Sequence, residues 1–253
     1  MPLFNRYIGV DYSGRGRPTD ATSAIRVFSA KTTGNPQAEG RDSGANWSRA
    51  SLGDWVTEQL KSGEPTIVGI DHGFSFPRNY LELCGWSEWC KMLASFSTRW
   101  PTDQSPVMSF RQEFPKPDDA KQLRLCESWT GTAKSVLDFT IKQGQVATST
   151  HAGIPWLNRL RQDFGDRICF WPFDELRPEA NQHVVAEVYP AWLKGKTAEL
   201  DSDDSDQRDA YRVCRWIQER DRADRLLPYL TLPTLTPAEL ETARLEGWIL
   251  GVV

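Results

Sequence analysis

The sequence predicts an α/β fold formed by a single domain over residues 1–253. Short apolar segments of strand length alternate along the chain with segments whose apolar residues have helical spacing. Hydrophobic residues make up 39% of the chain and aromatic residues 11%, which is enough for one large core. The formal net charge of -4 argues against an extended basic surface that would bind nucleic-acid phosphates regardless of sequence.

The first half of the chain contains three strand candidates and one helix. RYIGVD (6–11) predicts a strand, and SAIRVFSA (23–30), which lies between turn residues, is expected to be its antiparallel hairpin partner. Residues 31–46 read as a loop, with room for a further strand near Trp47. Ser51 is expected to cap a helix in SLGDWVTEQLKSG, and TIVGID (66–71) follows as a strand.

Residues from about 72 to 165 differ in composition and predict a mostly helical insertion, with helical stretches in DAKQLRLCESW and GIPWLNRLRQDFG. ICFWPF (168–173) and HVVAEVYP (183–190) are strand-like. DQRDAYRVCRWIQERDRADRLL and TPAELETARLEGWIL predict two helices near the end of the chain. The main fold is therefore expected to resume after the insertion.

The cysteine pattern and the apolar runs bear on compartment. The five cysteines are an odd number without a Cys-x-x-Cys pair, which favours reduced core thiols over a disulfide framework. No apolar run approaches the ~20 residues of a membrane span, and MPLFNRYIG lacks the features of a signal peptide. We therefore expect a cytoplasmic protein without membrane contact.

Four carboxylates occupy unusual positions. Asp11 and Asp71 each end an apolar strand, and Glu187 lies among valines in VVAEVYP. Asp209 lies on a helix beside Val213, near the apolar stripe. Buried carboxylates need a partner or a metal ion, because desolvating an isolated one costs several kcal/mol.

Two divalent cations would relieve the repulsion among four gathered carboxylates. Mg²⁺ or Mn²⁺ prefers oxygen ligands, and two ions can align an attacking water and stabilise the leaving oxygen in phosphodiester cleavage. We expect Asp11 to bridge both ions, Asp71 and Glu187 to complete one coordination shell, and Asp209 to complete the other. These residues predict a metal-dependent phosphodiester hydrolase, with a nuclease as the leading class.

The order of these motifs resembles the DUF429 family of uncharacterised proteins, which are predicted ribonuclease H-like nucleases. The resemblance rests on the two strand-ending aspartates, on FSFP after GID, on AEVYP, on DQRDAY, and on GTAKSVLDF with GIPWL. It implies a ribonuclease H-like mixed central sheet with antiparallel first strands, flanking helices and an acidic metal site at its centre. The substrate would be nucleic acid or a small phosphodiester.

Each carboxylate also has a purely structural interpretation. Asp11 and Asp71 both precede turn sequences and could bond backbone amides. Asp206 and Asp209 could cap a helix start. Glu187 could pair with an arginine such as Arg159 or Arg161.

Three further residues are candidates for substrate binding. Arg15 follows Asp11 in a loop, His72 adjoins Asp71, and Lys134 lies in GTAKS. The glycine spacing around Lys134 excludes a P-loop, although the lysine could still contact a phosphate. The alternatives are a mobile loop arginine, a packed histidine and a solvated lysine.

Two other functional classes stay open. GVDYSG and GIDHGF weakly resemble the paired phosphate-binding turns of actin-like and sugar-kinase phosphotransferases, but too little chain lies between them to form two lobes. A non-catalytic binding module with a structural acidic cluster is also consistent with the acidic composition.

Overall fold

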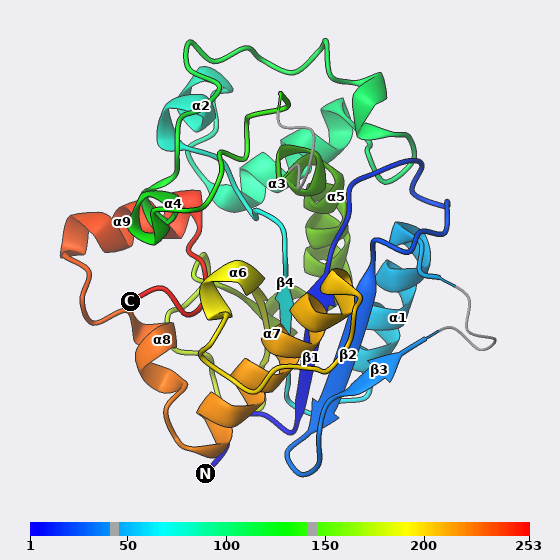
Figure 1. The fold of residues 1–253 in the computed structure, drawn as a ribbon. Helices are drawn as coiled ribbons and strands as arrows, with labels where there is room; N and C mark the ends of the chain where they lie inside the picture. The colour runs from blue at the N-terminus through cyan, green and yellow to red at the C-terminus, as the bar shows by residue number, and fades with distance from the viewer. Residues whose placement is uncertain (41–45, 141–145) are drawn as a thin grey trace.

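The computed structural model describes residues 1–40, 46–140 and 146–253. The described strands form one mixed sheet in the order β3-β2-β1-β4-β6-β5 (Figure 1). They are β1 (Arg6–Asp11), β2 (Arg26–Lys31), β3 (Gln37–Glu39), β4 (Thr66–Ile70), β5 (Ile168–Trp171) and β6 (His183–Glu187). The α/β class predicted from the sequence is confirmed.

The sheet combines an antiparallel edge with a parallel centre. β1 pairs antiparallel with β2, and β2 with β3, whereas β1, β4, β6 and β5 run parallel. The predicted hairpin of the first two strands is confirmed. The prediction of a strand near Trp47 was wrong: β3 lies at Gln37–Glu39, and Trp47 forms only an isolated bridge with Thr22. The part of the predicted loop at 41–45 lies outside the described residues.

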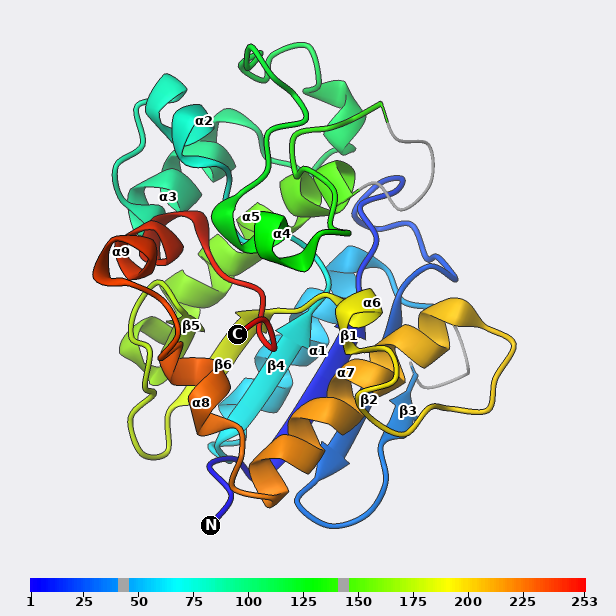
Figure 2. The ribbon, with the colours of Figure 1, turned by 60° about the vertical axis from the view of Figure 1, so that its left-hand side comes forward.

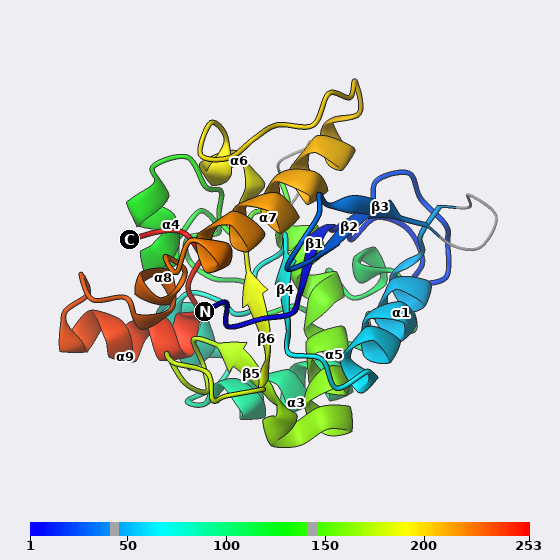
Figure 3. The same cartoon turned by 90° about the horizontal axis from the view of Figure 1, so that it is seen from below.

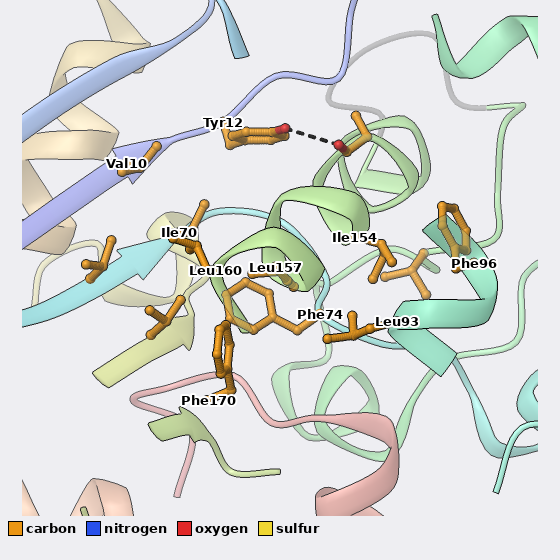
Figure 4. Packing of buried hydrophobic residues seen from close by; sticks show 14 of the residues in the cluster. Val10, Tyr12, Ile70, Phe74, Leu93, Phe96, Ile154, Leu157, Leu160 and Phe170 are labelled. Carbon is orange, nitrogen blue, oxygen red and sulfur yellow. Dashed lines mark hydrogen bonds between the residues drawn. The ribbon is translucent and has the colours of Figure 1, made fainter. Parts of the chain in front are cut away.

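Helices cover both faces of the sheet (Figure 3). α1 (Arg49–Lys61) and α5 (Val146–Phe164) lie on one face, and α7 (Ser205–Arg222) lies on the other. Val10 and Ile70 pack with α5 through Leu157 and its neighbours (Figure 4). The alternation of side chains along each strand therefore sorts the core into two layers.

The helix α7 approaches β1 so closely that only glycine fits between them. A Cβ atom on Gly9 would lie 2.4 Å from the carbonyl oxygen of Ala210, and one on Gly69 would lie 2.8 Å from Cγ1 of Val213. This contact fixes α7 on the sheet. The first turns of α7 consequently lie beside the carboxyl ends of the central strands.

The segment 72–165 departs from a mostly helical insertion. Its short helices α2 (Arg78–Leu83), α3 (Trp89–Arg99) and α4 (Leu125–Thr130) and the 3-10 turn η1 (Val107–Ser109) are joined by irregular chain. The expected helix at DAKQLRLCESW begins only at Leu125. α5, in contrast, is longer than GIPWLNRLRQDFG and belongs to the main fold, because it covers the sheet. Residues 141–145 of this segment lie outside the described part.

Four short helical elements remain. They are η2 (Gly165–Arg167), α6 (Pro190–Leu193), α8 (Leu227–Thr231) and α9 (Pro237–Glu246). Figure 2 shows α9 on the same side of the molecule as α2, α3 and α4, toward the carboxyl ends of β4 and β1. The cap predicted at Ser51 is one turn late: Ser48 is the N-cap of α1, and Ser51 completes its capping box.

The cysteines are free thiols, of which Cys126, Cys169 and Cys214 are buried as expected. Cys90 is exposed, which differs from the prediction of core thiols. Within the described residues, no helix combines the length and the apolar character needed to cross a membrane.

Candidate active site

The four predicted carboxylates line one cavity of about 840 Å³. The register pairs Val10 with Ile70 and Ile70 with Glu187, so that Asp11 and Asp71 occupy the next positions of neighbouring strands. Asp209 lies near the start of α7, which crosses the same end of the sheet. Parallel pairing therefore brings together residues that are far apart in the sequence.

The carboxylates do not all lie on the same face of the sheet. Asp11 follows Gly9 by two positions and Asp71 follows Gly69 by two, and both glycines face α7. Glu187 follows Val185 by two positions, so the two side chains point to the same face of the sheet. The side chain of Val185 packs in the core layer that contains α5. Because successive side chains alternate, Glu187 extends from the opposite face.

Glu187 forms an ion pair with Arg124 in the protein interior. Nη1 of Arg124 donates to Oε2 at 2.7 Å and Nη2 donates to Oε1 at 2.5 Å. The backbone N–H of Phe74 also donates to Oε2 at 3.1 Å. The structural interpretation of Glu187, that it pairs with an arginine, is therefore confirmed. The arginines suggested for it were wrong, because Arg159 pairs with Asp54 and Arg161 pairs with Asp174.

Arg124 is held by several groups in addition to Glu187. Its Nε donates to Oε1 of Glu127 at 3.0 Å, and its Nη1 donates to the carbonyl oxygen of Glu246 at 3.1 Å. The arginine is only 1% exposed. It was not among the sequence candidates, although its position in LRLCES, a charged residue between leucines, was a signal of burial.

Asp11 and Asp71 have no cationic partner within the described residues. Burial, followed by the negative charges of Asp71, Asp206, Asp209 and Asp204, raises the pKa of Asp11 to about 10. Burial and the charges of Asp209 and Glu187 raise the pKa of Asp71 to about 8, against a lowering by its hydrogen bond with Asp11. Without a cation, the pair therefore retains a proton at neutral pH.

Asp209 is partly neutralised by an arginine. Its carboxylate accepts a hydrogen bond from Nη1 of Arg212, which also forms an ion pair with Glu199 at 2.7 Å. Burial still raises the pKa of Asp209, against the lowering effect of Arg212. Asp209 therefore has Arg212 as a cationic partner and also lines the cavity.

The helix-cap interpretation applies to a different residue. Asp204 is the N-cap of α7 and accepts hydrogen bonds from the N–H groups of Asp206 and Gln207. Asp206 lies on the lining of the cavity, as does Asp209. The capping prediction for Asp206 and Asp209 was therefore wrong, because the cap is Asp204. Asp206 instead adds a carboxylate to the cavity lining.

His72 is buried and lines the cavity, with its ring 4.7 Å from that of Tyr12 and 4.9 Å from that of Phe74. A Cβ atom on Gly153 would lie 2.4 Å from Nε2 of His72, which shows how tightly α5 covers the ring. Burial lowers the pKa of His72 to about 4, so the ring is neutral at physiological pH.

Arg15 and Lys134 are the exposed cations of the cavity lining. Neither side chain has an ion-pair or hydrogen-bond partner among the described residues. Both side chains are therefore available to bind an anionic ligand.

The donor set at Asp11 and Asp71 fits a divalent cation in its chemistry. Two adjacent carboxylates whose charge the protein leaves uncompensated are hard oxygen donors of the kind that Mg²⁺ prefers. Glu187 fits less well, since both of its oxygens accept from Arg124. Across the described parts of the chain, no group of three or more His, Cys, Asp or Glu side chains is arranged to hold a metal ion.

Comparisons of the chain with protein-family models, with curated proteins and with solved structures gave no match. The resemblance to the DUF429 family therefore stays a prediction.

Proposed function

We propose that the protein is a metal-dependent phosphodiester hydrolase, of the nuclease class, that acts at Asp11 and Asp71. The observation that carries the proposal is the juxtaposition of these two carboxylates at the ends of parallel strands, without a cationic partner, in a cavity. The antiparallel β1, β2 and β3 beside the parallel β4 and β6 also agree with a ribonuclease H-like sheet.

Asp11 and Asp71 would hold the metal, with Asp209 and Asp206 adding negative charge beside them. Mg²⁺ or Mn²⁺ in such a site lowers the pKa of water and stabilises the leaving oxygen of a phosphodiester, and two ions form the arrangement usual in nucleases. Arg15 and Lys134 would contact the phosphate oxygens of the substrate. Their positive charges would compensate the charge that the substrate brings.

Glu187 has a different role in this proposal from the one predicted for it. Its ion pair with Arg124 fixes the end of β6 and the start of α4, and its negative charge raises the pKa of Asp71. His72 is neutral and buried, and its ring packs against those of Tyr12 and Phe74 next to Asp71. Both residues are therefore assigned to positioning.

The phosphotransferase alternative is disfavoured by the backbone of the second turn. The N–H groups of Asp71 and His72 donate to the carbonyl oxygens of Val10 and Ile70, and that of Gly73 donates to Thr150. A turn that binds phosphate needs these groups to face the ligand. In this chain they are used within the fold.

Titration calorimetry with Mn²⁺ tests the proposal first. Wild type is expected to bind the ion, and Asp11→Asn and Asp71→Asn are each expected to lose at least about tenfold in affinity, about 1.4 kcal/mol. Asp166→Asn, an exposed aspartate outside the cavity, is the matched control and should bind as wild type does.

Cleavage of labelled nucleic acids with Mg²⁺ or Mn²⁺ is the second arm. Activity in wild type and in Asp166→Asn that is absent from a folded Asp71→Asn supports the assignment. Retained cleavage in Asp71→Asn would assign the activity to a contaminant. Wild type that binds no metal and cleaves nothing leaves the binding-module class as the better explanation.

A further inference from the structure

The cavity over Asp11 and Asp71 is bounded by the segment 72–165 as well as by the sheet. Val107 and Met108 of η1 line it, together with Pro106 and Lys134 from the irregular chain of that segment. The loop after β1 contributes Arg15, and the N-terminal part of α5 contributes Val146. A ligand that reaches the carboxylates therefore has protein around it on several sides.

The volume of the cavity sets the size of what enters it. Pockets of roughly 300–1,000 Å³ enclose most of a drug-sized ligand. At about 840 Å³ the cavity matches a nucleotide or two rather than a length of double helix. A nucleobase can enter a cavity of this size only when it is unpaired, because pairing and stacking otherwise hold it inside the duplex.

The charges of the lining are unevenly distributed. The carboxylates Asp11, Asp71, Asp206 and Asp209 lie at the strand ends and on α7, while Arg15 and Lys134 lie on loops and are exposed. Among the described residues of the lining, these two cations are the ones without partners. Two cations suffice for one or two phosphates, but they do not form the long basic track that a duplex requires.

Apolar side chains complete the cavity. Val107 and Ile249 are buried at 1% and 3% exposure, whereas Met108 is 53% exposed. An exposed methionine on a cavity lining offers a flexible, polarisable contact for an aromatic ring such as a nucleobase. The lining therefore provides for an organic group as well as for a phosphate.

We infer that the substrate of this site is an unpaired nucleotide phosphodiester, either in a single strand or in a dinucleotide, with its base against Met108 and its phosphate between Lys134 and the carboxylates. This inference rests on the proposed hydrolase function and specifies its substrate class. The combination of an enclosing segment, a nucleotide-sized volume and an exposed apolar contact carries it.

Fluorescence anisotropy measures binding independently of catalysis. The probes are a labelled short single-stranded oligonucleotide and the same sequence as a blunt duplex, each with Ca²⁺ and with EDTA. With Ca²⁺, wild type is expected to bind the single strand at least about tenfold more tightly than the duplex. Met108→Ala and Lys134→Ala should each weaken single-strand binding by about threefold or more.

Exposed residues outside the cavity provide the controls. Leu83→Ala and Lys121→Ala remove similar side chains at exposed positions that do not line the cavity, and they should bind as wild type does. All four substitutions are at exposed positions, so folding should be preserved. Unlabelled dinucleotide, added as a competitor, distinguishes the two sources: displacement at low concentration indicates a small substrate, and none indicates a longer strand.

Cleavage assays with Mn²⁺ separate the two levels of the proposal. Duplex cleavage at a rate equal to or above that of the single strand, abolished by Asp71→Asn, would overturn the inference and keep the hydrolase. Equal binding of both probes, unaffected by Met108→Ala, would also overturn it. If wild type binds Mn²⁺ but cleaves no probe, the hydrolase proposal fails, and the substrate inference fails with it.

Discussion

Arg124 and Glu187 form a bidentate ion pair in the interior, with N–O distances of 2.7 and 2.5 Å, and it joins α4 to the end of β6. The two residues are 1% and 4% exposed. This pair decides which of the predicted carboxylates remain available at the site. Arg124 pairs with Glu187 on the α5 face of the sheet, while Asp11 and Asp71 face α7 and have no cationic partner in the part of the chain that the structure describes.

Removal of Arg124 tests the energetic importance of this pair. Arg124→Met leaves Glu187 and Glu127 buried without their cation and should lower the free energy of unfolding by about 3–5 kcal/mol. The double variant Arg124→Met/Glu187→Leu also removes one of the two unpaired buried carboxylates, so it should recover part of the lost free energy of unfolding. Urea denaturation measures both variants.

The control for this prediction is Arg159→Met, whose pair with Asp54 is solvent-exposed and should contribute at most about 1 kcal/mol. A double variant as unstable as the sum of its single variants would contradict the ion-pair interpretation.

The stability of the metal-free protein should depend on the ionisation of Asp71. Its pKa is raised from 3.8 to about 8, so the folded state binds the proton more tightly than the unfolded state does. That contribution is fully present below about pH 4 and is lost as pH rises toward 8. In EDTA, wild type should lose at least about 1 kcal/mol more than Asp71→Asn between pH 5 and pH 8.

Thermal unfolding at the two pH values measures this difference, with Asp166→Asn as the control. Addition of Mn²⁺ should restore the stability of wild type at pH 8, because a cation takes the place of the proton. Parallel pH profiles of wild type and Asp71→Asn would show that the carboxylate is already compensated.

Gly9→Ala tests the close contact of α7 with β1. The added Cβ would lie 2.4 Å from the carbonyl oxygen of Ala210, so the helix must shift and the variant should lose about 1–3 kcal/mol of stability. Because α7 carries Asp209, Mn²⁺ binding should weaken as well. Gly40→Ala, where nothing lies within 4 Å, should leave both stability and Mn²⁺ binding unchanged.

Asp221 anchors the beginning of the chain to the end of α7. It accepts hydrogen bonds from the N–H groups of Leu3 at 2.9 Å and Phe4 at 3.0 Å and from the Tyr7 hydroxyl at 2.8 Å. Asp221→Ala should cost about 2–4 kcal/mol, since it leaves buried donors without an acceptor.

Tyr7→Phe removes one of those bonds and should cost less than Asp221→Ala. A double-mutant cycle by chemical denaturation should show coupling between the two residues of about 0.5 kcal/mol or more. Asp224→Asn is the control and should be near neutral, because Asp224 is exposed, pairs with the N-terminal amine at 3.9 Å, and has a positive φ that asparagine tolerates. Strict additivity of Asp221→Ala and Tyr7→Phe would contradict direct contact.

The strands were predictable because their signal is local. RYIGVD coincides with β1, and β4 and β6 take up the first five residues of TIVGID and of HVVAEVYP, since continuous apolar runs between polar turns are typical of buried parallel strands. The weaker signals failed. β3 is only three residues long and exposed along most of its length, so no apolar pattern marked it.

The segment from 100 to 124 was harder to predict for a physical reason. Its residues are held by contacts with distant parts of the chain, as in the bond from the Thr102 hydroxyl to the His151 carbonyl at 2.6 Å. Helical spacing in DAKQLRLCESW predicted a longer helix than α4. Arg124 instead precedes the first turn, where its backbone N–H is held by Glu127.

Local patterns were enough to predict that Asp11 and Asp71 end apolar strands and that Glu187 lies within one, because apolar runs and turn residues are visible in a short stretch of chain. The surroundings of these carboxylates followed from the tertiary structure. Strand pairing placed the strand ends side by side, and Arg124, which lies 63 positions before Glu187 in the chain, forms the ion pair with the glutamate. Pairing and packing between distant segments follow from the fold as a whole, and for that reason no single motif in the chain specifies them.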